Sequence, residues 1–138
     1  MLSAKTLPLA CLLLFLPLPA SAQLGMVGSW FGYGQPDDKS AMYIDHMRPD
    51  GYWRGEYRTC VKGKAHDQTQ VGRWSLAGDV LSLHIETVDG QSAPRTDTYK
   101  MLARDAKSQK YVSLSHNFPY TPKRVADNFQ MPPCDLTS

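Results

Sequence analysis

Apolar and polar residues alternate with a period of two along most of the chain, in short segments separated by glycine, proline and aspartate. This period is typical of half-buried β-strands, and no segment after residue 22 has a convincing helical period. The alternation predicts eight strands, over residues 28–34, 42–48, 52–61, 69–76, 80–88, 95–104, 110–115 and 120–126. The connections include Asp50-Gly51, Gly78-Asp79 and Asp89-Gly90, whose residues accept a positive φ, so consecutive strands should run antiparallel.

The same alternation assigns a buried face to each strand. In the third predicted strand, Trp53 and Tyr57 share one side with Thr59 and Val61, and we expect this aromatic side to face the core. The inward positions of the next two strands are Gln70, Gly72, Trp74, Leu76, Leu81, Leu83 and Ile85. The opposite side of the third strand, expected to point outward, carries Arg54, Glu56, Arg58 and Cys60.

Eight short antiparallel strands without a helix to cover an edge most simply close into an up-and-down β-barrel. A two-sheet β-sandwich is the alternative. The interior of an eight-stranded barrel is either filled by side chains or holds one small ligand. The fold class therefore permits ligand binding without requiring it.

The first 22 residues have the pattern of a cleavable signal peptide. Lys5 precedes an apolar stretch over residues 7–18, which is too short for a bilayer-spanning helix, and small residues follow at Ala20-Ser21-Ala22. We expect cleavage between Ala22 and Gln23, export to the periplasm or outside the cell, and no stable membrane span afterwards. A permanent membrane anchor is the alternative. Residues 23–138 then form a single barrel domain.

The cysteines agree with an oxidising compartment. Of the three in the chain, Cys11 lies in the expected signal peptide, which leaves Cys60 and Cys134. A disulfide between them would staple the C-terminal segment, with its rigid Pro132-Pro133, across the outside of the sheet. Two free buried thiols are the alternative, and neither cysteine has the spacing of a metal ligand.

The charge pattern excludes one class of partner. Basic and acidic residues are nearly balanced, 15 against 13, and no block of one sign occurs. The sequence therefore predicts no nucleic-acid partner.

Short motifs resemble those of the lipocalins and related small β-barrels. Gly28-Ser29-Trp30 is similar to the Gly-x-Trp motif that opens the first lipocalin strand, and Thr96-Asp97-Thr98-Tyr99 resembles the lipocalin Thr-Asp-Tyr element with one residue inserted. The resemblance implies that Trp30 plugs the closed end of a barrel and that Arg124 packs on it. It also implies a lid-like first loop over residues 32–39, for which an ordinary connector is the alternative.

The chain departs from this pattern in three ways. Gly-x-Trp recurs as Gly72-Arg73-Trp74, and avidin-type barrels also use it. The 116 residues left after cleavage are few for a lipocalin, and the helix that follows the eighth lipocalin strand is replaced by a proline-rich segment. The chain most resembles small exported lipocalin-like barrels of bacteria.

A search for catalytic and cofactor motifs finds no nucleophile elbow, phosphate loop, nucleotide-binding glycine pattern or zinc-protease helix. We predict no cofactor and no metal, because three of the four histidines, which lie on four segments, would have to converge. On a continuous strand, Ser113 and Ser115 would lie opposite His116, which argues against a nucleophilic dyad. Glu56 and Glu86 are better explained by ion pairs with nearby arginines than by acid–base catalysis.

Aromatic residues are spread over most of the strands and could line a barrel mouth. We expect their rings to contact an apolar or amphipathic ligand, with an arginine at the rim holding a carboxylate. The candidate binding residues are Trp53, Arg54, Tyr57, Arg58, Trp74 and Tyr99.

Three functions remain open for the chain. The first is a non-enzymatic binding protein with a ligand inside its barrel. The second is an envelope protein with a filled interior that binds another protein, as an inhibitor, immunity factor or assembly factor does. The third is a small hydrolytic or isomerising enzyme. An interior cavity would distinguish the first from the second.

Overall fold

The structure, a computed structural model, describes residues 25–135. The expected signal peptide, residues 1–22, and its cleavage site at Ala22 and Gln23 lie outside the described residues. Within them, no helix is long and apolar enough to span a bilayer. The strands are β1 (Gly28–Gln35), β2 (Asp38–Met47), β3 (Tyr52–Val61), β4 (Lys64–Ala77), β5 (Val80–Val88), β6 (Gln91–Arg104), β7 (Gln109–Ser113), β8 (Pro119–Tyr120) and β9 (Lys123–Val125).

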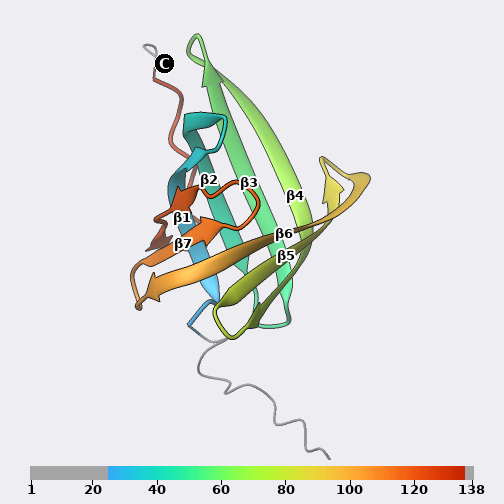
Figure 1. Cartoon of the computed structure of the whole chain (residues 1–138). Coiled ribbons are helices and arrows are strands. Elements are labelled where there is room, and N and C mark those ends of the chain that lie inside the picture. The colour runs from blue at the N-terminus through green and yellow to red at the C-terminus, as the bar shows by residue number, and fades with distance from the viewer. Residues whose placement is uncertain (1–24, 136–138) are drawn as a thin grey trace, which may run out of the picture.

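These strands form one antiparallel sheet in the order β8-β7-β6-β5-β4-β3-β2-β1-β9. Strands β1 to β8 follow one another in sequence order, and β9 lies beside β1. The sheet is strongly curled into a half-barrel (Figure 1). The predicted all-β, up-and-down architecture is confirmed, and a single continuous sheet takes the place of the alternative two-sheet sandwich.

The two edges of the sheet meet on one short segment, residues 119–125. In β8, Tyr120 pairs with Tyr111 of β7, at one end of the strand order. In β9, Arg124 pairs with Trp30 of β1, at the other end. Backbone pairing along this segment therefore connects the end of the sheet to its beginning.

Pro122 divides this closing segment. The single strand predicted over residues 120–126 is split there into β8 and β9, because proline has no N–H to donate and fixes its own φ. Its carbonyl still accepts a hydrogen bond from the N–H of Gln109 (3.0 Å), and the N–H of Arg124 donates to the carbonyl of Lys107 (2.8 Å). The segment thus remains paired on both sides of the proline.

Three strands begin earlier than the alternation indicates. β2 starts at Asp38, β4 at Lys64 and β6 at Gln91, rather than at positions 42, 69 and 95. The added residues are mostly polar and exposed, so they have no apolar period, and backbone pairing within the hairpins holds them in place. The expected lid-like loop over residues 32–39 is accordingly reduced to a turn at residues 36–37.

The inward face of the curled sheet carries the core. Its fully buried side chains include Trp30, Trp53 and Tyr43. The inward positions predicted for β4 and β5 are all buried, which confirms the alternation: Gln70, Gly72, Trp74, Leu76, Leu81, Leu83 and Ile85.

Trp30 and Arg124 pack together near the start of β1. The guanidinium carbon of Arg124 lies 4.2 Å from a ring centroid of Trp30, and its Nη1 donates to the carbonyl of Val27 at 2.7 Å. Gly28 has a φ of +130°, and a Cβ there would lie 2.2 Å from Nη1 of Arg124. The packing that the lipocalin resemblance implies for these two residues is present, and a glycine is required beside it.

The segment after β9 crosses the outside of the sheet and is covalently attached to it. Cys60 and Cys134 form the expected disulfide, with 5.6 Å between their Cα atoms. Beside it, Nη1 of Arg58 donates to the carbonyl of Pro132 at 2.9 Å and lies 3.4 Å from that of Met131. The outward orientation predicted for Cys60 is confirmed.

Replacing both disulfide cysteines by serine should lower the free energy of unfolding. The bond closes a separation of 74 residues, for which the chain-entropy relation gives a stabilisation of about 4 kcal/mol. Urea unfolding of the oxidised protein and of the Cys60→Ser/Cys134→Ser variant measures this difference. Equal midpoints for the two proteins would contradict it.

Candidate functional site

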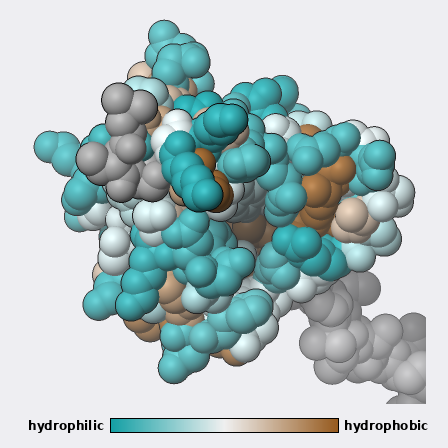
Figure 2. All heavy atoms as spheres, turned by 90° about the horizontal axis from the view of Figure 1, so that it is seen from above, coloured by the Kyte–Doolittle hydropathy of each residue, from teal (hydrophilic) through white to brown (hydrophobic). Residues whose placement is uncertain are grey.

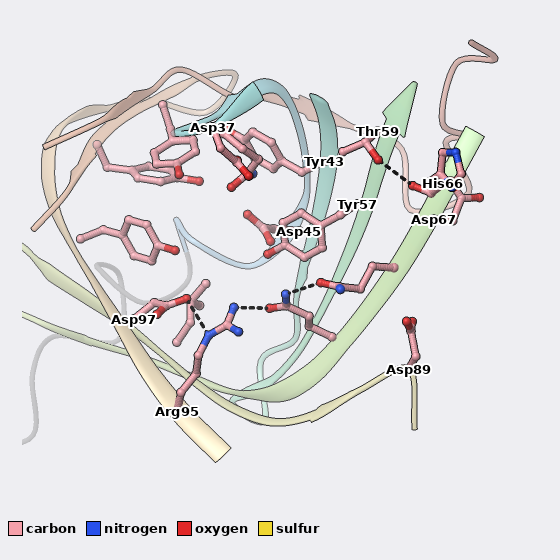
Figure 3. Close-up of a pocket in the computed structure, with 17 residues that line it drawn as sticks. Asp37, Tyr43, Asp45, Tyr57, Thr59, His66, Asp67, Asp89, Arg95 and Asp97 are labelled. Carbon is pink, nitrogen blue, oxygen red and sulfur yellow. Dashed lines mark hydrogen bonds and ion pairs between the residues drawn. The ribbon is translucent and has the colours of Figure 1, made fainter. Parts of the chain in front are cut away.

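A cavity of about 400 Å³ opens between the inward faces of the strands, at the end of the sheet near the β1–β2 turn. Seen from above, this end has a hollow with apolar residues in its depth and hydrophilic residues around it (Figure 2). Side chains from nearly every strand contribute to the wall (Figure 3). The polar and aromatic residues that line it include Asp37, Tyr43, Asp45, Tyr57, His66, Asp67, Gln70, Asp89, Arg95, Asp97, Tyr99, Tyr111 and Tyr120.

Five tyrosines dominate this wall, one from each of β2, β3, β6, β7 and β8. Four of them support one another: Tyr111 stacks on Tyr120, with 5.2 Å between centroids, and Tyr43 and Tyr99 each meet Tyr120 edge to face. Such ring contacts hold the side chains in a preferred geometry. The aromatic wall therefore exists before any ligand binds.

Two glycines make room for the rings. Gly32 lies directly opposite Tyr43 in the β1–β2 pair, and a Cβ there would lie 2.5 Å from the Tyr43 hydroxyl oxygen. Gly55 lies opposite Asp45, and its Cβ would lie 2.6 Å from Trp53 and 2.8 Å from Tyr57. The rings of Tyr43, Trp53 and Tyr57 can lie close to the strand backbone only because these two inward positions have no side chain.

Asp45 is the buried polar group of the cavity. Its side chain is 5 % exposed, and Oδ1 accepts a hydrogen bond from Nε1 of Trp53 at 3.0 Å. Burial raises the pKa of Asp45 to about 6, against the opposing effects of the Trp53 hydrogen bond, the neighbouring His46 and the Tyr111 hydroxyl. The carboxylate is therefore largely ionised at neutral pH, at a cost to the stability of the fold.

The Tyr43 hydroxyl is the second notable group. It is buried, with the residue 2 % exposed, and no described group is well aligned for a hydrogen bond with it, although the Tyr111 hydroxyl lies near enough to lower its pKa. Burial, and then the negative charge of Asp45, raises the pKa of Tyr43 well above its ordinary value, so the phenol stays neutral. A buried donor without a partner is costly, and a ligand in the cavity could supply the missing hydrogen bond.

The arginines in and beside the cavity, Arg95 in its wall and Arg58 on the outer face, are already paired. Arg95 lies 3.4 Å from Asp97 and also 3.4 Å from the side-chain oxygen of Gln70. Arg58 binds Asp67 through two nitrogens, at 2.7 and 2.9 Å. This pairing raises the pKa of Arg58 and lowers that of Asp67. Neither guanidinium is left over to bind an anion.

The residues predicted to bind a ligand are only partly brought together. Tyr57 and Tyr99 line the cavity. Trp53 instead supports Asp45 from within the core, and Trp74 donates to the carbonyl of Arg48. Neither tryptophan lines the cavity, because both pack among the buried side chains of the core.

Arg54 and Arg58 do not form the expected carboxylate site. Both lie on the outer face of β3, on the opposite side from Trp53 and Tyr57, so their side chains point away from the cavity. Arg54 lies 3.9 Å from Glu56, while Arg58 holds Asp67 and the C-terminal segment. The period of two that buries the aromatic residues is the reason that these arginines are outside.

The sequence did not single out three of the lining residues, namely Tyr43, Asp45 and Tyr120, and it offered Tyr111 only as one of many aromatic residues. One signal was present. Tyr43, Asp45 and Met47 alternate along β2 and share its inward face, so an acidic side chain occupies a core position. An inward-facing aspartate is unusual and could have indicated a polar site.

A second polar cluster, Ser29, His46, Glu56 and Asp127, lies on the outer face. Ser29 Oγ lies 2.8 Å from Nδ1 of His46, whose Nε2 lies 2.6 Å from Oε2 of Glu56. Ser29 is 1 % exposed and donates its hydroxyl proton to Asp127 at 2.9 Å. The cluster thereby ties the segment after β9 to β1 and β2, and its serine proton is committed to that contact.

The strand-parity argument for His116 is wrong. β7 ends at Ser113 and the chain then turns, so Ser115 Oγ lies 2.8 Å from Nδ1 of His116 and Ser113 Oγ lies 3.5 Å from it. Parity holds only on a continuous strand. These three residues line a hollow beside the mouth of the cavity.

Metal-binding side chains do not converge in residues 25–135, where no group of three or more His, Cys, Asp or Glu could hold an ion. His46 contacts Ser29 and Glu56, and His84 contacts Thr96.

No protein-family model and no curated protein matches this sequence. The geometry of the cavity is therefore the basis for a functional conclusion.

Replacing Asp45 by asparagine should stabilise the protein at neutral pH. Folding raises the pKa of this carboxyl from 3.8 to about 6, so the folded state binds the proton more tightly, and stability falls as pH rises from about 4 to about 6. We expect Asp45→Asn to raise the free energy of unfolding by roughly 2–3 kcal/mol at pH 7.5 and by much less at pH 4. Urea unfolding at both pH values measures this.

The matched control is Asp79→Asn, at an exposed position in the β4–β5 turn. It should change the free energy of unfolding by less than about 0.5 kcal/mol at either pH. If the advantage of Asp45→Asn were the same at pH 4 and pH 7.5, the assigned cost of burying this charge would be wrong.

Proposed function

We propose that this chain is an exported binding protein of the lipocalin-like type that holds one small amphipathic molecule in the tyrosine-lined cavity. The observation that carries the proposal is the tyrosine-lined cavity of about 400 Å³, which is bordered by the buried Tyr43 hydroxyl, a group without a well-aligned hydrogen-bond partner. Cavities of this size are in the range that small-molecule ligands occupy. The ligand would supply the missing hydrogen bond and fill the space between the rings.

The cavity has both properties that an amphipathic ligand needs. The tyrosine rings offer apolar contact area, while Asp45, Gln70 and the tyrosine hydroxyls offer polar atoms that can orient a ligand. The ring contacts and the two inward glycines keep the wall open in advance. A site that is formed before binding loses little free energy to reorganisation.

Export is the second part of the proposal. Its support is the signal-peptide pattern of residues 1–22 together with the Cys60–Cys134 disulfide, which is stable in oxidising compartments such as the periplasm or the extracellular space. The open cavity favours a ligand carrier over an envelope protein with a filled interior.

The direct test is the mass of the protein purified from its own periplasm or medium. Measured under native conditions, it should exceed the denatured mass by that of one small molecule. The denatured mass should also correspond to a chain that begins at Gln23 and contains one disulfide. Native protein without any additional mass, together with no binding of added amphipathic compounds, would overturn the proposal.

Gly55→Ala should reduce binding by closing part of the cavity. The new methyl group would displace the rings of Trp53 and Tyr57, which lie within 3 Å of its position. We expect the variant to bind the co-purified molecule about tenfold more weakly than the wild type does. This is a loss of about 1.4 kcal/mol of binding free energy. Native mass spectrometry at matched protein concentration provides the measurement.

Arg54→Ala is the control for this variant, because Arg54 lies on the same strand and points outward. It should retain full occupancy. Thermal unfolding of both variants checks that they are folded at the temperature of the binding measurement. Full occupancy in folded Gly55→Ala would argue against this cavity as the binding site.

A further inference from the structure

The cavity contains a buried negative charge that forms no ion pair with a described cation of the protein. Asp45 is 5 % exposed, and its Oδ1 accepts a hydrogen bond from the neutral indole of Trp53. Among the ion pairs of residues 25–135, none includes Asp45. A carboxylate in this environment gains from any positive charge that enters the cavity, because charges interact more strongly in a poorly hydrated interior.

The whole wall has an excess of acid. Carboxylates from five aspartates line the cavity, against one arginine and one histidine. Arg95 is paired with Asp97, and Asp67 is paired with Arg58, which reaches it from outside. The three remaining carboxylates, those of Asp37, Asp45 and Asp89, form no ion pair with a described residue. A ligand carboxylate would therefore be repelled, and a cation attracted.

The aromatic rings favour the same charge. A tyrosine ring presents a negative π-face, on which ammonium groups bind, and aromatic cages of this kind hold amines and quaternary ammonium ions. Five tyrosines line the cavity, and Figure 3 shows Tyr43 and Tyr57 beside Asp45. The Tyr43 hydroxyl oxygen, which has no well-aligned partner in the protein, can in addition accept a hydrogen bond from an ammonium N–H.

We infer that the molecule held in this cavity is an organic cation, a protonated amine or quaternary ammonium ion attached to an apolar body. The positive group lies against Asp45 and Tyr43, and the apolar body extends between the tyrosine rings toward the mouth. This inference rests on the proposed function and adds the chemical class of the ligand. The sequence led us to expect a ligand with a carboxylate held by Arg54 or Arg58. Because both arginines point away from the cavity, we infer a cationic ligand instead.

The test uses three probes with one apolar body and different head groups: 4-phenylbutylamine, 4-phenylbutanol and 4-phenylbutyrate. Each is titrated at pH 7.5 and low salt into protein refolded after denaturation to remove any bound molecule, and binding is measured by calorimetry. We expect the amine to bind at least about tenfold more tightly than the alcohol, and the carboxylate to bind most weakly.

Asp45→Asn should remove the preference without removing the site. Its affinity for the amine should fall about tenfold, to near that of the alcohol, while its affinity for the alcohol stays within about twofold of the wild-type value. Binding of the alcohol also shows that the variant is folded. Asp79→Asn removes one exposed carboxylate in the β4–β5 turn and should bind the amine as the wild type does.

The outcomes separate the two proposals. Equal affinity for amine and alcohol, or tighter binding of the carboxylate, overturns the cationic ligand and leaves the binding protein intact. If no probe binds, the elemental composition of the co-purified molecule decides: a basic nitrogen supports the cation, and its absence overturns it. If no probe binds and nothing co-purifies, the proposed function fails together with the inference.

Discussion

Backbone hydrogen bonds along residues 119–125 hold the two edges of the sheet together, and the interior of the protein depends on them. β8 pairs with β7 and β9 pairs with β1, with Pro122 between them. Without this segment the strands would form an open sheet with two unpaired edges, which are prone to associate with other chains. Because the segment joins them, the inward faces of distant strands enclose a common space.

That interior is divided into a packed part and an open part by the size of the side chains at inward positions. Near the start of β1, Trp30 is buried in the core and packs against the guanidinium of Arg124. Toward the β1–β2 turn, two inward positions are occupied by glycines, Gly32 and Gly55. The rings of Tyr43 and Tyr57 pack over these glycines, close to the strand backbone. The same curled sheet thus has a solid core at one end and a cavity at the other.

The contacts on the outer face secure the C-terminal segment of the chain. The Cys60–Cys134 bond, the contacts of Arg58 with the C-terminal segment and the hydrogen bond from Ser29 to Asp127 all lie on the side of the sheet opposite the cavity. Long polar side chains can therefore stabilise the C-terminal segment without reducing the space inside. The cavity side keeps Asp45, a buried carboxylate whose charge lowers the stability of the fold and which a cationic ligand, as we propose, would stabilise.

The sequence by itself determined the order of the strands, the inward face of their central residues and the pairing of the two cysteines that remain after the expected cleavage, but neither every strand boundary nor the exposure of Val61 at the end of β3. Local order is sufficient for these features, because a period of two follows from the geometry of one strand, as for Trp53 and Tyr57, and because two cysteines allow only one disulfide. The cavity was decided by the tertiary structure. Its wall combines Tyr43 and Asp45 of β2 with Tyr111 of β7 and Tyr120 of β8, and only the curl and closure of the sheet bring these side chains together. The contact between Ser115 and His116 likewise depends on where β7 ends, which backbone pairing sets and the residue pattern does not.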